Sequence, residues 1–184
     1  MNRDQALELL KQNLDNQNLI KHCLAVEAVM RALARQLGEN EDQWGIAGLL
    51  HDIDYEKTKD DPNKHSLVGA QMLEEAGLSK EICQAVKVHN EIHGIQPEAP
   101  MDKALFTIDP LTGLIVAATL VLPSKKITDL TVENVLNRFK EKAFARGINR
   151  EIIKQSEGLL DIKLEEFVKT GLQAMQKINK DLGL

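Results

Sequence analysis

Apolar residues recur along the chain at the three- and four-residue spacing of helices, and no segment alternates as a surface strand does. Helices are expected over about 4–13 and about 18–37. The second of these carries an apolar stripe made of Leu19, Val26, Val29, Leu33 and Leu37. Gly38 follows the stripe, and a glycine after the last apolar position typically ends a helix. The pattern therefore predicts an all-α protein.

The middle of the chain continues this helical pattern. A third helix is expected over about 41–51, and the polar loop YEKTKDDPNK follows it. His65 opens a fourth helix, which Gly77 closes. Ser79 then caps a fifth helix. One face of that helix carries Ile82, Val86 and His89.

A sixth helical region contains Asp109 followed by Pro110, which either kinks one long helix or starts a new one. Pro123 ends this region, and the chain from about Thr131 onward predicts three more amphipathic helices. The apolar run over 111–122 is too short to cross a bilayer and is interpreted as buried core. We expect a single helical bundle over 1–184, with a C-terminal helical extension over about 131–184.

Composition and charge narrow the classes of partner. Aromatic residues are only 3% of the chain, so aliphatic side chains must build the core. The net charge of −5 argues against a non-specific nucleic-acid binder but allows a local site for small anions. Cys23 and Cys83 are too few for a disulfide framework, and no signal-peptide pattern is present. We therefore expect a cytoplasmic protein with no nucleic-acid polymer and no membrane as partner. The sequence leaves the oligomeric state open.

Four of the five histidines fall among core positions of the predicted helices, namely His22, His51, His65 and His89. A buried imidazole costs about 1–3 kcal/mol for each unpaired polar group, and one divalent metal can satisfy several such groups. Asp52 and Asp109 add carboxylates, and a mixed His and Asp set favours a first-row transition metal over calcium. Taken singly, each histidine fits a backbone hydrogen bond in the core, and Asp109 fits a helix cap. Only the combination indicates a metal site.

The order of His22, the His51–Asp52 pair and Asp109 resembles the H…HD…D signature of the HD superfamily of metal-dependent hydrolases. The segments GLLHDI, KHSLVGAQMLEEAG and AVKVHN also look like its HDIG-type members. The resemblance covers about 17–125 and implies that this region is the metal-binding core of a single HD-type domain. After the HD pair the chain departs from many such members, because it has DYEK where they have glycine and then lysine.

The resemblance also implies the ligands. One ion would be held by His22, His51, Asp52 and Asp109. A second ion would be held by His65 and His89, with Asp52 as the bridging ligand and the catalytic base partner. We therefore expect a binuclear site with two divalent ions per chain, Fe or Mn in first place and Zn, Ni or Mg as further options.

The implied activity is hydrolysis of a phosphoester or phosphoanhydride by a metal-bound hydroxide, with a nucleotide or other small phosphorylated metabolite as substrate. No nucleophile motif competes, since the chain has neither a G-x-S-x-G elbow nor a P-loop. Lys57, His93 and Lys126 are candidate contacts for an anionic substrate, although lysines in loops are more often solvated. Two alternatives stay open: a mixed-valent di-iron oxygenase with the same ligands, and a nucleotide-binding module without turnover.

Overall fold

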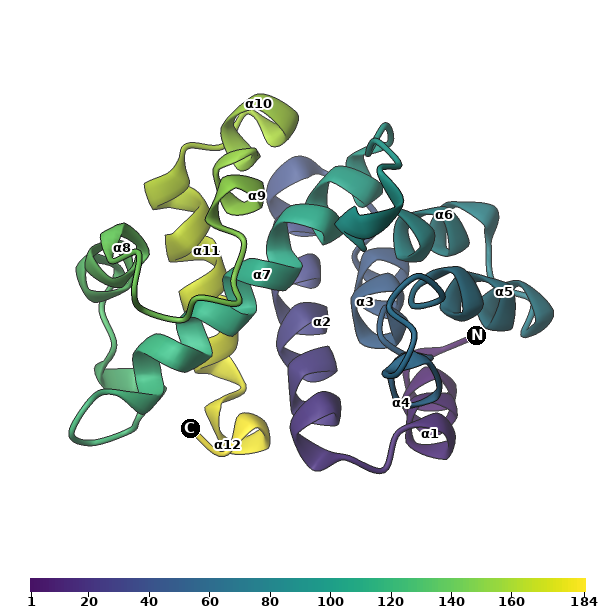
Figure 1. Cartoon of the computed structure of the whole chain (residues 1–184), viewed down its shortest axis with the longest axis horizontal. Coiled ribbons are helices and arrows are strands. Elements are labelled where there is room, and N and C mark those ends of the chain that lie inside the picture. Colours follow the sequence, from purple (N-terminus) through teal and green to yellow (C-terminus); the bar gives the residue numbers. More distant parts are fainter.

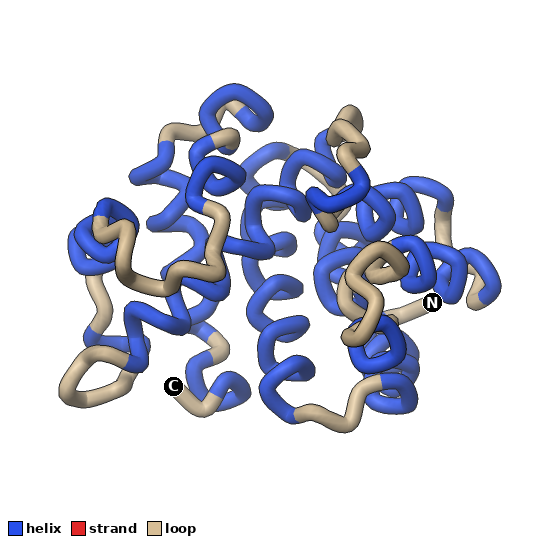
Figure 2. Tube along the Cα trace, in the orientation of Figure 1, coloured by secondary structure: helices blue, strands red, loops and turns tan.

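The computed structural model describes residues 1–184, and all of its regular elements are helices, as predicted (Figure 2). The first part of the chain forms α1 (Arg3–Asn13), α2 (Gln17–Leu37), α3 (Glu41–Leu50), α4 (Tyr55–Thr58), α5 (Leu67–Glu75), α6 (Lys80–Val88) and the 3-10 helix η1 (Glu91–His93). The second part forms α7 (Pro100–Leu120), the 3-10 helix η2 (Ile127–Asp129), α8 (Val132–Lys140), α9 (Arg150–Lys154), α10 (Ser156–Leu160), α11 (Leu164–Lys177) and α12 (Asn179–Leu182).

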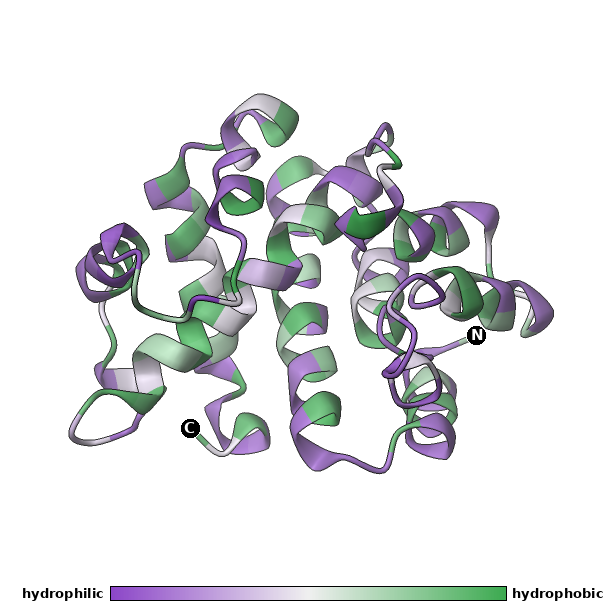
Figure 3. Ribbon diagram, viewed as in Figure 1, coloured by the Kyte–Doolittle hydropathy of each residue, from purple (hydrophilic) through white to green (hydrophobic).

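Two long helices, α2 and α7, occupy the middle of the molecule and pack against each other (Figure 1). Helices α1 and α3 to α6 lie on one side of this pair, and α8 to α12 lie on the other. Hydrophobic residues occupy the faces that these helices turn toward one another, and hydrophilic residues gather on the outer faces (Figure 3). One continuous core contains buried side chains from both sides, including Trp44 in α3 and Phe167 in α11. The two long helices therefore form the centre of the bundle, and the other helices pack around them.

Several helix ends fall where the sequence predicts them. Gly38 ends α2 in the left-handed region with φ of 76°, where a residue with a side chain is strained. The Ser79 side chain caps α6 by accepting a hydrogen bond from the backbone N–H of Ile82. Thr131 caps α8 by accepting from the N–H of Asn134. These ends are fixed by local chemistry, which is why the sequence reveals them.

Other boundaries differ from the prediction. His65 does not open a helix, because Ser66 takes a left-handed conformation with φ of 71° and α5 begins only at Leu67. Pro110 lies inside the continuous helix α7, so it does not start a new one. The chain after Thr131 forms the five helices α8 to α12 instead of three, since the long turn before Arg150 and the left-handed Asp161 interrupt the pattern.

Helix α7 is long and apolar enough, by length and composition alone, to cross a membrane. The apolar run over 111–122 is only part of this helix, so the length of the run was not a sufficient argument against a span. In the structure, 61% of the most apolar window of α7 is buried, as in the core helix of a soluble protein. The interpretation of this run as core is consistent with that burial, while the cytoplasmic location stays a prediction.

Gly48 sets the closest approach of α3 to α2. A Cβ atom at this position would lie 2.9 Å from the Cγ of Met30 and 3.0 Å from the Cα of Glu27, which belongs to the backbone of α2. Neither distance is compatible with an unshifted neighbour. The absence of a side chain therefore lets α3 pack tightly on α2 and fixes where the end of α3 lies relative to α2.

We predict that Gly48→Ala lowers the free energy of unfolding by about 1–3 kcal/mol, because overpacking outweighs the gain in helix propensity. Chemical denaturation of the purified protein would measure this change. Gly158→Ala in α10 is the matched control, since nothing lies within 4 Å of its added Cβ. Equal stabilities of the two variants would contradict the close-approach argument.

Candidate metal centre

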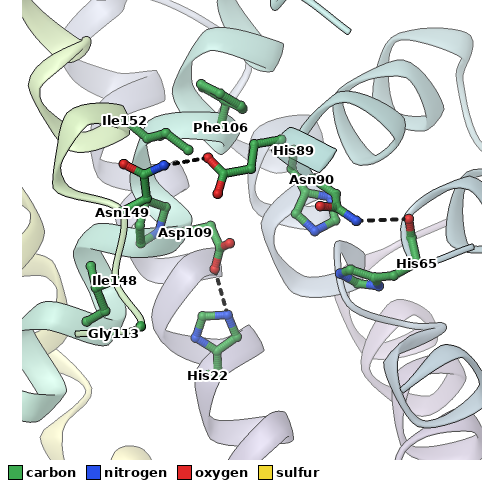
Figure 4. Close-up of a pocket in the computed structure, with 13 residues that line it drawn as sticks. His22, His65, His89, Asn90, Phe106, Asp109, Gly113, Ile148, Asn149 and Ile152 are labelled. Carbon is green, nitrogen blue, oxygen red and sulfur yellow. Dashed lines mark hydrogen bonds and ion pairs between the residues drawn. The ribbon is translucent and has the colours of Figure 1, made fainter. Parts of the chain in front are cut away.

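Five segments bring polar side chains to one place between α2 and α7. His22 comes from α2, His51 and Asp52 from the turn that follows α3, and Asp109 from the middle of α7. His65 comes from the turn before α5, and His89 directly follows α6. Figure 4 shows His22 and Asp109 facing each other, with His65 and His89 across the same cavity. The six residues predicted as ligands therefore converge in space.

The first group consists of His22, His51 and Asp109. The Nε2 atom of His22 lies 2.9 Å from Oδ1 of Asp109 and 3.2 Å from Nε2 of His51. The Nε2 atom of His51 is 3.7 Å from the same Asp109 oxygen. The three ligand atoms all lie within 4.8 Å of one another, a spacing at which they could hold one metal ion.

Asp52 lies between this group and the other two histidines. Its Oδ2 atom is 3.4 Å from Nε2 of His51 and 3.6 Å from Nε2 of His22. Its Oδ1 atom is 3.2 Å from Nε2 of His65 and 3.5 Å from Nε2 of His89. The two oxygens of one carboxylate thus face two different histidine pairs.

Three of the histidines are oriented by a hydrogen bond at their Nδ1 atom. Nδ1 of His51 donates to the carbonyl of Gly48 at 2.8 Å, and Nδ1 of His89 donates to the carbonyl of Val86 at 2.6 Å. Nδ1 of His22 lies 3.4 Å from the hydroxyl of Thr112, which itself donates to a backbone carbonyl. With Nδ1 as the donor, the lone pair of each ring is on Nε2 and points to the centre.

Asp54 orients the fourth histidine and is a functional candidate that the sequence argument missed. Its buried carboxylate accepts from Nδ1 of His65 at 3.0 Å and from the backbone N–H groups of Ser66 and Gly69, both at 2.9 Å. These bonds hold the strained turn that carries His65. In the sequence, Asp54 stands in a charge-rich stretch, where a buried acid looks the same as a solvated one. Its place two residues after Asp52 was the only signal.

The donor set fits a divalent metal. Two imidazole nitrogens that both carry lone pairs repel each other at the 3.2 Å that separates His22 from His51, unless a proton or a cation lies between them. Imidazole nitrogens with carboxylate oxygens are ligands that first-row transition metals accept. A second group of close ligand atoms is formed by His51, Asp52 and His89. Metal binding is therefore well supported, whereas the identity and number of the ions stay predictions.

The buried acids and imidazoles shift each other's pKa values. Burial alone would lower the pKa of His51 and of His65. The charge of Asp52 nevertheless raises the pKa of His51 well above its usual value, and hydrogen bonds to Asp52 and Asp54 raise the pKa of His65 to about 9. Burial would raise the pKa of Asp109, but His22 and His51 lower it below its usual value. In the metal-free protein the carboxylates are therefore ionised and balanced by imidazolium.

The centre opens into a cavity of about 310 Å³. Its walls contain no lysine and no arginine, and Asn90, Asn149 and Glu91 are the polar lining residues besides the predicted ligands (Figure 4). The predicted substrate contacts lie elsewhere. The ammonium of Lys57 donates to Asn13 at 2.7 Å, and Nε2 of His93 bonds the backbone carbonyl of His65 at 2.8 Å. Lys126 precedes η2 and does not line the cavity. We therefore leave these three residues out of the proposed substrate site.

Comparison with known proteins identifies relatives of this chain. The model of the HD domain matches residues 19–162. Ribonuclease Y of Oleidesulfovibrio alaskensis is 30% identical over 142 residues, which are 74% of this chain and 27% of the relative. Ribonuclease Y of Lawsonia intracellularis is 29% identical over 139 residues, covering 74% of this chain and 26% of the relative. Ribonuclease Y of Fervidobacterium nodosum is 37% identical over 84 residues, which are 45% of this chain and 16% of the relative. No solved structure matches.

The chain spans about a quarter of the length of the first two relatives. Their name contradicts one expectation from the sequence, namely that only small anions and no nucleic-acid polymer would be partners. That expectation was wrong because it rested on the net charge of −5. Net charge bears on non-specific attraction to a polyanion, whereas a centre of metal ligands can engage a single phosphate whatever the charge of the remaining surface.

We predict that metal binding releases protons and strengthens as the pH rises from about 6.5 to about 9, because the imidazolium of His65 must lose its proton to become a ligand. The same proton stabilises the metal-free fold. That contribution is complete below about 6.5 and is lost as the pH rises through about 9. Calorimetric titration with Mn²⁺ in two buffers of different ionisation enthalpy measures the release. Heats that do not depend on the buffer near neutral pH would contradict the prediction.

We further predict that Asp54→Asn lowers the metal affinity by about 10- to 100-fold, as is typical when the partner of a metal-binding histidine is changed. The amide cannot accept from all three donors that the carboxylate serves. Competition with a chelator of known affinity measures the loss. Asp60→Asn is the control, because Asp60 is an exposed acid in the same segment between α3 and α5. Equal affinities of the two variants would show that Asp54 does not support the centre.

Proposed function

The chain belongs to the HD-domain family of metal-dependent phosphohydrolases, and from this premise we propose that it hydrolyses phosphodiester bonds of RNA at the His and Asp centre. The observation that carries the proposal is the position of Asp52, whose two oxygens face two separate histidine pairs. Its relatives named as ribonucleases support RNA as the substrate class.

We propose that the centre holds two divalent ions. His22, His51 and Asp109 would bind the first, and His65 and His89 would bind the second. Asp52 would contact both. When bound, such ions lower the pKa of a coordinated water and offset the negative charge of the phosphoryl oxygens. Fe and Mn fit the mixed imidazole and carboxylate ligands well, and Zn, Ni and Mg are the other options.

The chain itself offers no competing nucleophile. No serine, threonine, cysteine or lysine lines the cavity. Cys23 is next to His22 in the chain, but it is fully buried and burial raises the pKa of its thiol, which makes the reactive thiolate scarce. The remaining role for the protein is to orient the ligands and to admit the phosphate. Burial alone would raise the pKa of Asp52, but the surrounding imidazoles lower it well below its usual value, so this carboxylate is suited to holding cations and not to accepting a proton.

The cavity also limits how RNA can bind. A volume of about 310 Å³ is at the small end of the range for ligand sites, so one nucleotide unit would enter while the rest of the strand stays outside. Without lysine or arginine in the walls of this cavity, the metal centre would supply the positive charge that recognises the phosphate. The affinity for RNA should accordingly depend less on salt than that of a protein with many cationic contacts.

The ligand set is also compatible with a di-iron oxygenase and with a nucleotide-binding module that has no turnover. Cleavage of the substrate under anaerobic conditions would exclude the di-iron oxygenase, because hydrolysis requires water and no oxygen. Product formation separates the second. Either result would be obtained in the same assay on short RNA.

We predict that the metal-loaded protein shortens single-stranded RNA without consuming oxygen. Asp52→Asn should lower the rate by about 100-fold or more, because the variant loses the negative charge shared by the histidine pairs. Gel analysis of labelled oligoribonucleotides, with Mn²⁺ or Fe²⁺ and after chelation, measures this. Asp129→Asn serves as the control, since Asp129 is exposed and outside the cavity. Intact RNA under all metal conditions would sink the proposal.

A further inference from the structure

One wall of the cavity comes from the C-terminal part of the chain. This wall is formed by Gly147, Ile148, Asn149 and Ile152. All four residues lie outside the region over 17–125 that the sequence analysis assigned to the metal-binding core. In Figure 4, Ile148, Asn149 and Ile152 lie on the side of the cavity away from His65. The C-terminal helices therefore carry a segment that completes the site.

Three of the four wall residues belong to the irregular stretch over 141–149, while Ile152 lies in α9. Arg150, the first residue of α9, holds that stretch together. Its guanidinium donates to the backbone carbonyls of Phe139 at 2.9 Å, Ala145, Ile148 and Glu141 at 3.3 Å each, and Phe144. An arginine side chain has five N–H donors, and here each donor has a carbonyl. The carbonyls of an irregular loop lack the partners that a helix provides, so this one side chain satisfies groups that would otherwise disfavour the fold of the loop.

Two more contacts fix the wall relative to the centre. The Nδ2 atom of Asn149 donates to Oε2 of Glu91 at 2.7 Å, and Glu91 lies two residues after His89. Ile148 packs over Gly113 of α7, where an added Cβ would meet its Cδ1 at 3.5 Å. The wall is thus joined to the segment that follows one predicted ligand and to the helix that carries another.

The chemistry of this wall differs from that of the metal end. It presents the apolar side chains of Ile148 and Ile152 beside Phe106, together with the neutral amide of Asn149. A phosphate gains nothing from such groups. A flat, uncharged organic group with polar edges does, because its faces can pack on the isoleucines and its edge can bond an amide.

We propose that residues 147–152 form the subsite for the nucleoside part of the substrate, and that Arg150 is its positioning residue. This inference rests on the proposed function and adds how the substrate is selected. Arg150 does not line the cavity, so it acts only through the backbone that it holds. Removing its side chain should loosen the wall and leave the metal ligands in place.

The test compares two phosphodiesters with the same leaving group. Methyl 4-nitrophenyl phosphate offers only the ester, and uridine 5′-(4-nitrophenyl phosphate) adds a nucleoside. The full chain loaded with Mn²⁺ should prefer the nucleoside ester in kcat/KM. In Arg150→Gln that preference should fall by about tenfold, mainly through KM, while the methyl ester and the metal content stay within about twofold. Arg150→Lys should not restore it, because an ammonium cannot serve five carbonyls.

Two further variants sharpen the test. Arg146→Gln removes the same charge from the same loop, but Arg146 is exposed and bonds no carbonyl, so its preference should be that of the original chain. Ile148→Ala trims the wall directly and should lower the preference even if Arg150→Gln folds poorly.

The outcomes separate the two proposals. A selective loss with the nucleoside ester supports the subsite. An equal change with both esters, or no preference in the original chain, overturns the subsite and leaves phosphodiester hydrolysis standing. If neither ester is cleaved, the RNA assay decides hydrolysis, and calorimetry with uridine 5′-monophosphate and methyl phosphate decides the subsite. Tighter binding of the nucleotide that Arg150→Gln abolishes supports it, and equal binding overturns it.

Discussion

The structure depends on one buried carboxylate. Asp52 is almost inaccessible to solvent, and an anion in that position is tolerated only when opposite charge surrounds it. Four imidazoles supply that environment, two at each oxygen. These imidazoles belong to α2, to the ends of α3 and α6, and to the turn before α5. The four histidines surround Asp52 only if these helices pack in the observed arrangement. The tight contact of α3 on α2 at Gly48 belongs to the same requirement, because it sets where the end of α3 lies.

The sequence predicted the six side chains that converge, but not what holds them. A polar ring among core positions is visible in a sequence as an interruption of the apolar pattern. Two of the four ring N–H groups donate to backbone carbonyls, those of Gly48 and Val86, and a carbonyl has no sequence signature. Each of these two lies three residues before its histidine, so the end of a helix supplies it automatically. Asp54 is visible in the sequence as an acidic residue, but the sequence does not reveal that it is buried. Its burial depends on how the loop folds back on α5.

The same division applies to the fold. Ends set by a single residue, such as Gly38, Ser79 and Thr131, were predictable because the cap and the helix are neighbours in the chain. The helices after Thr131 were predicted in too small a number. The helical pattern is interrupted by an irregular stretch that the Arg150 side chain holds in place through hydrogen bonds to five backbone carbonyls. No local sequence preference predicts such a set of bonds.

The charge of the chain was the weakest guide to function, and the cavity explains why. A net charge is a sum over the whole surface, and here acids exceed bases by five. The cavity contains none of the lysines and arginines, so their number says nothing about whether a phosphate can enter it. In the proposed site, recognition would be divided between the charged metal end and the neutral wall over 147–152. A long anionic strand then needs to match the protein only at the nucleotide that is inside, which makes an acidic protein compatible with an RNA substrate.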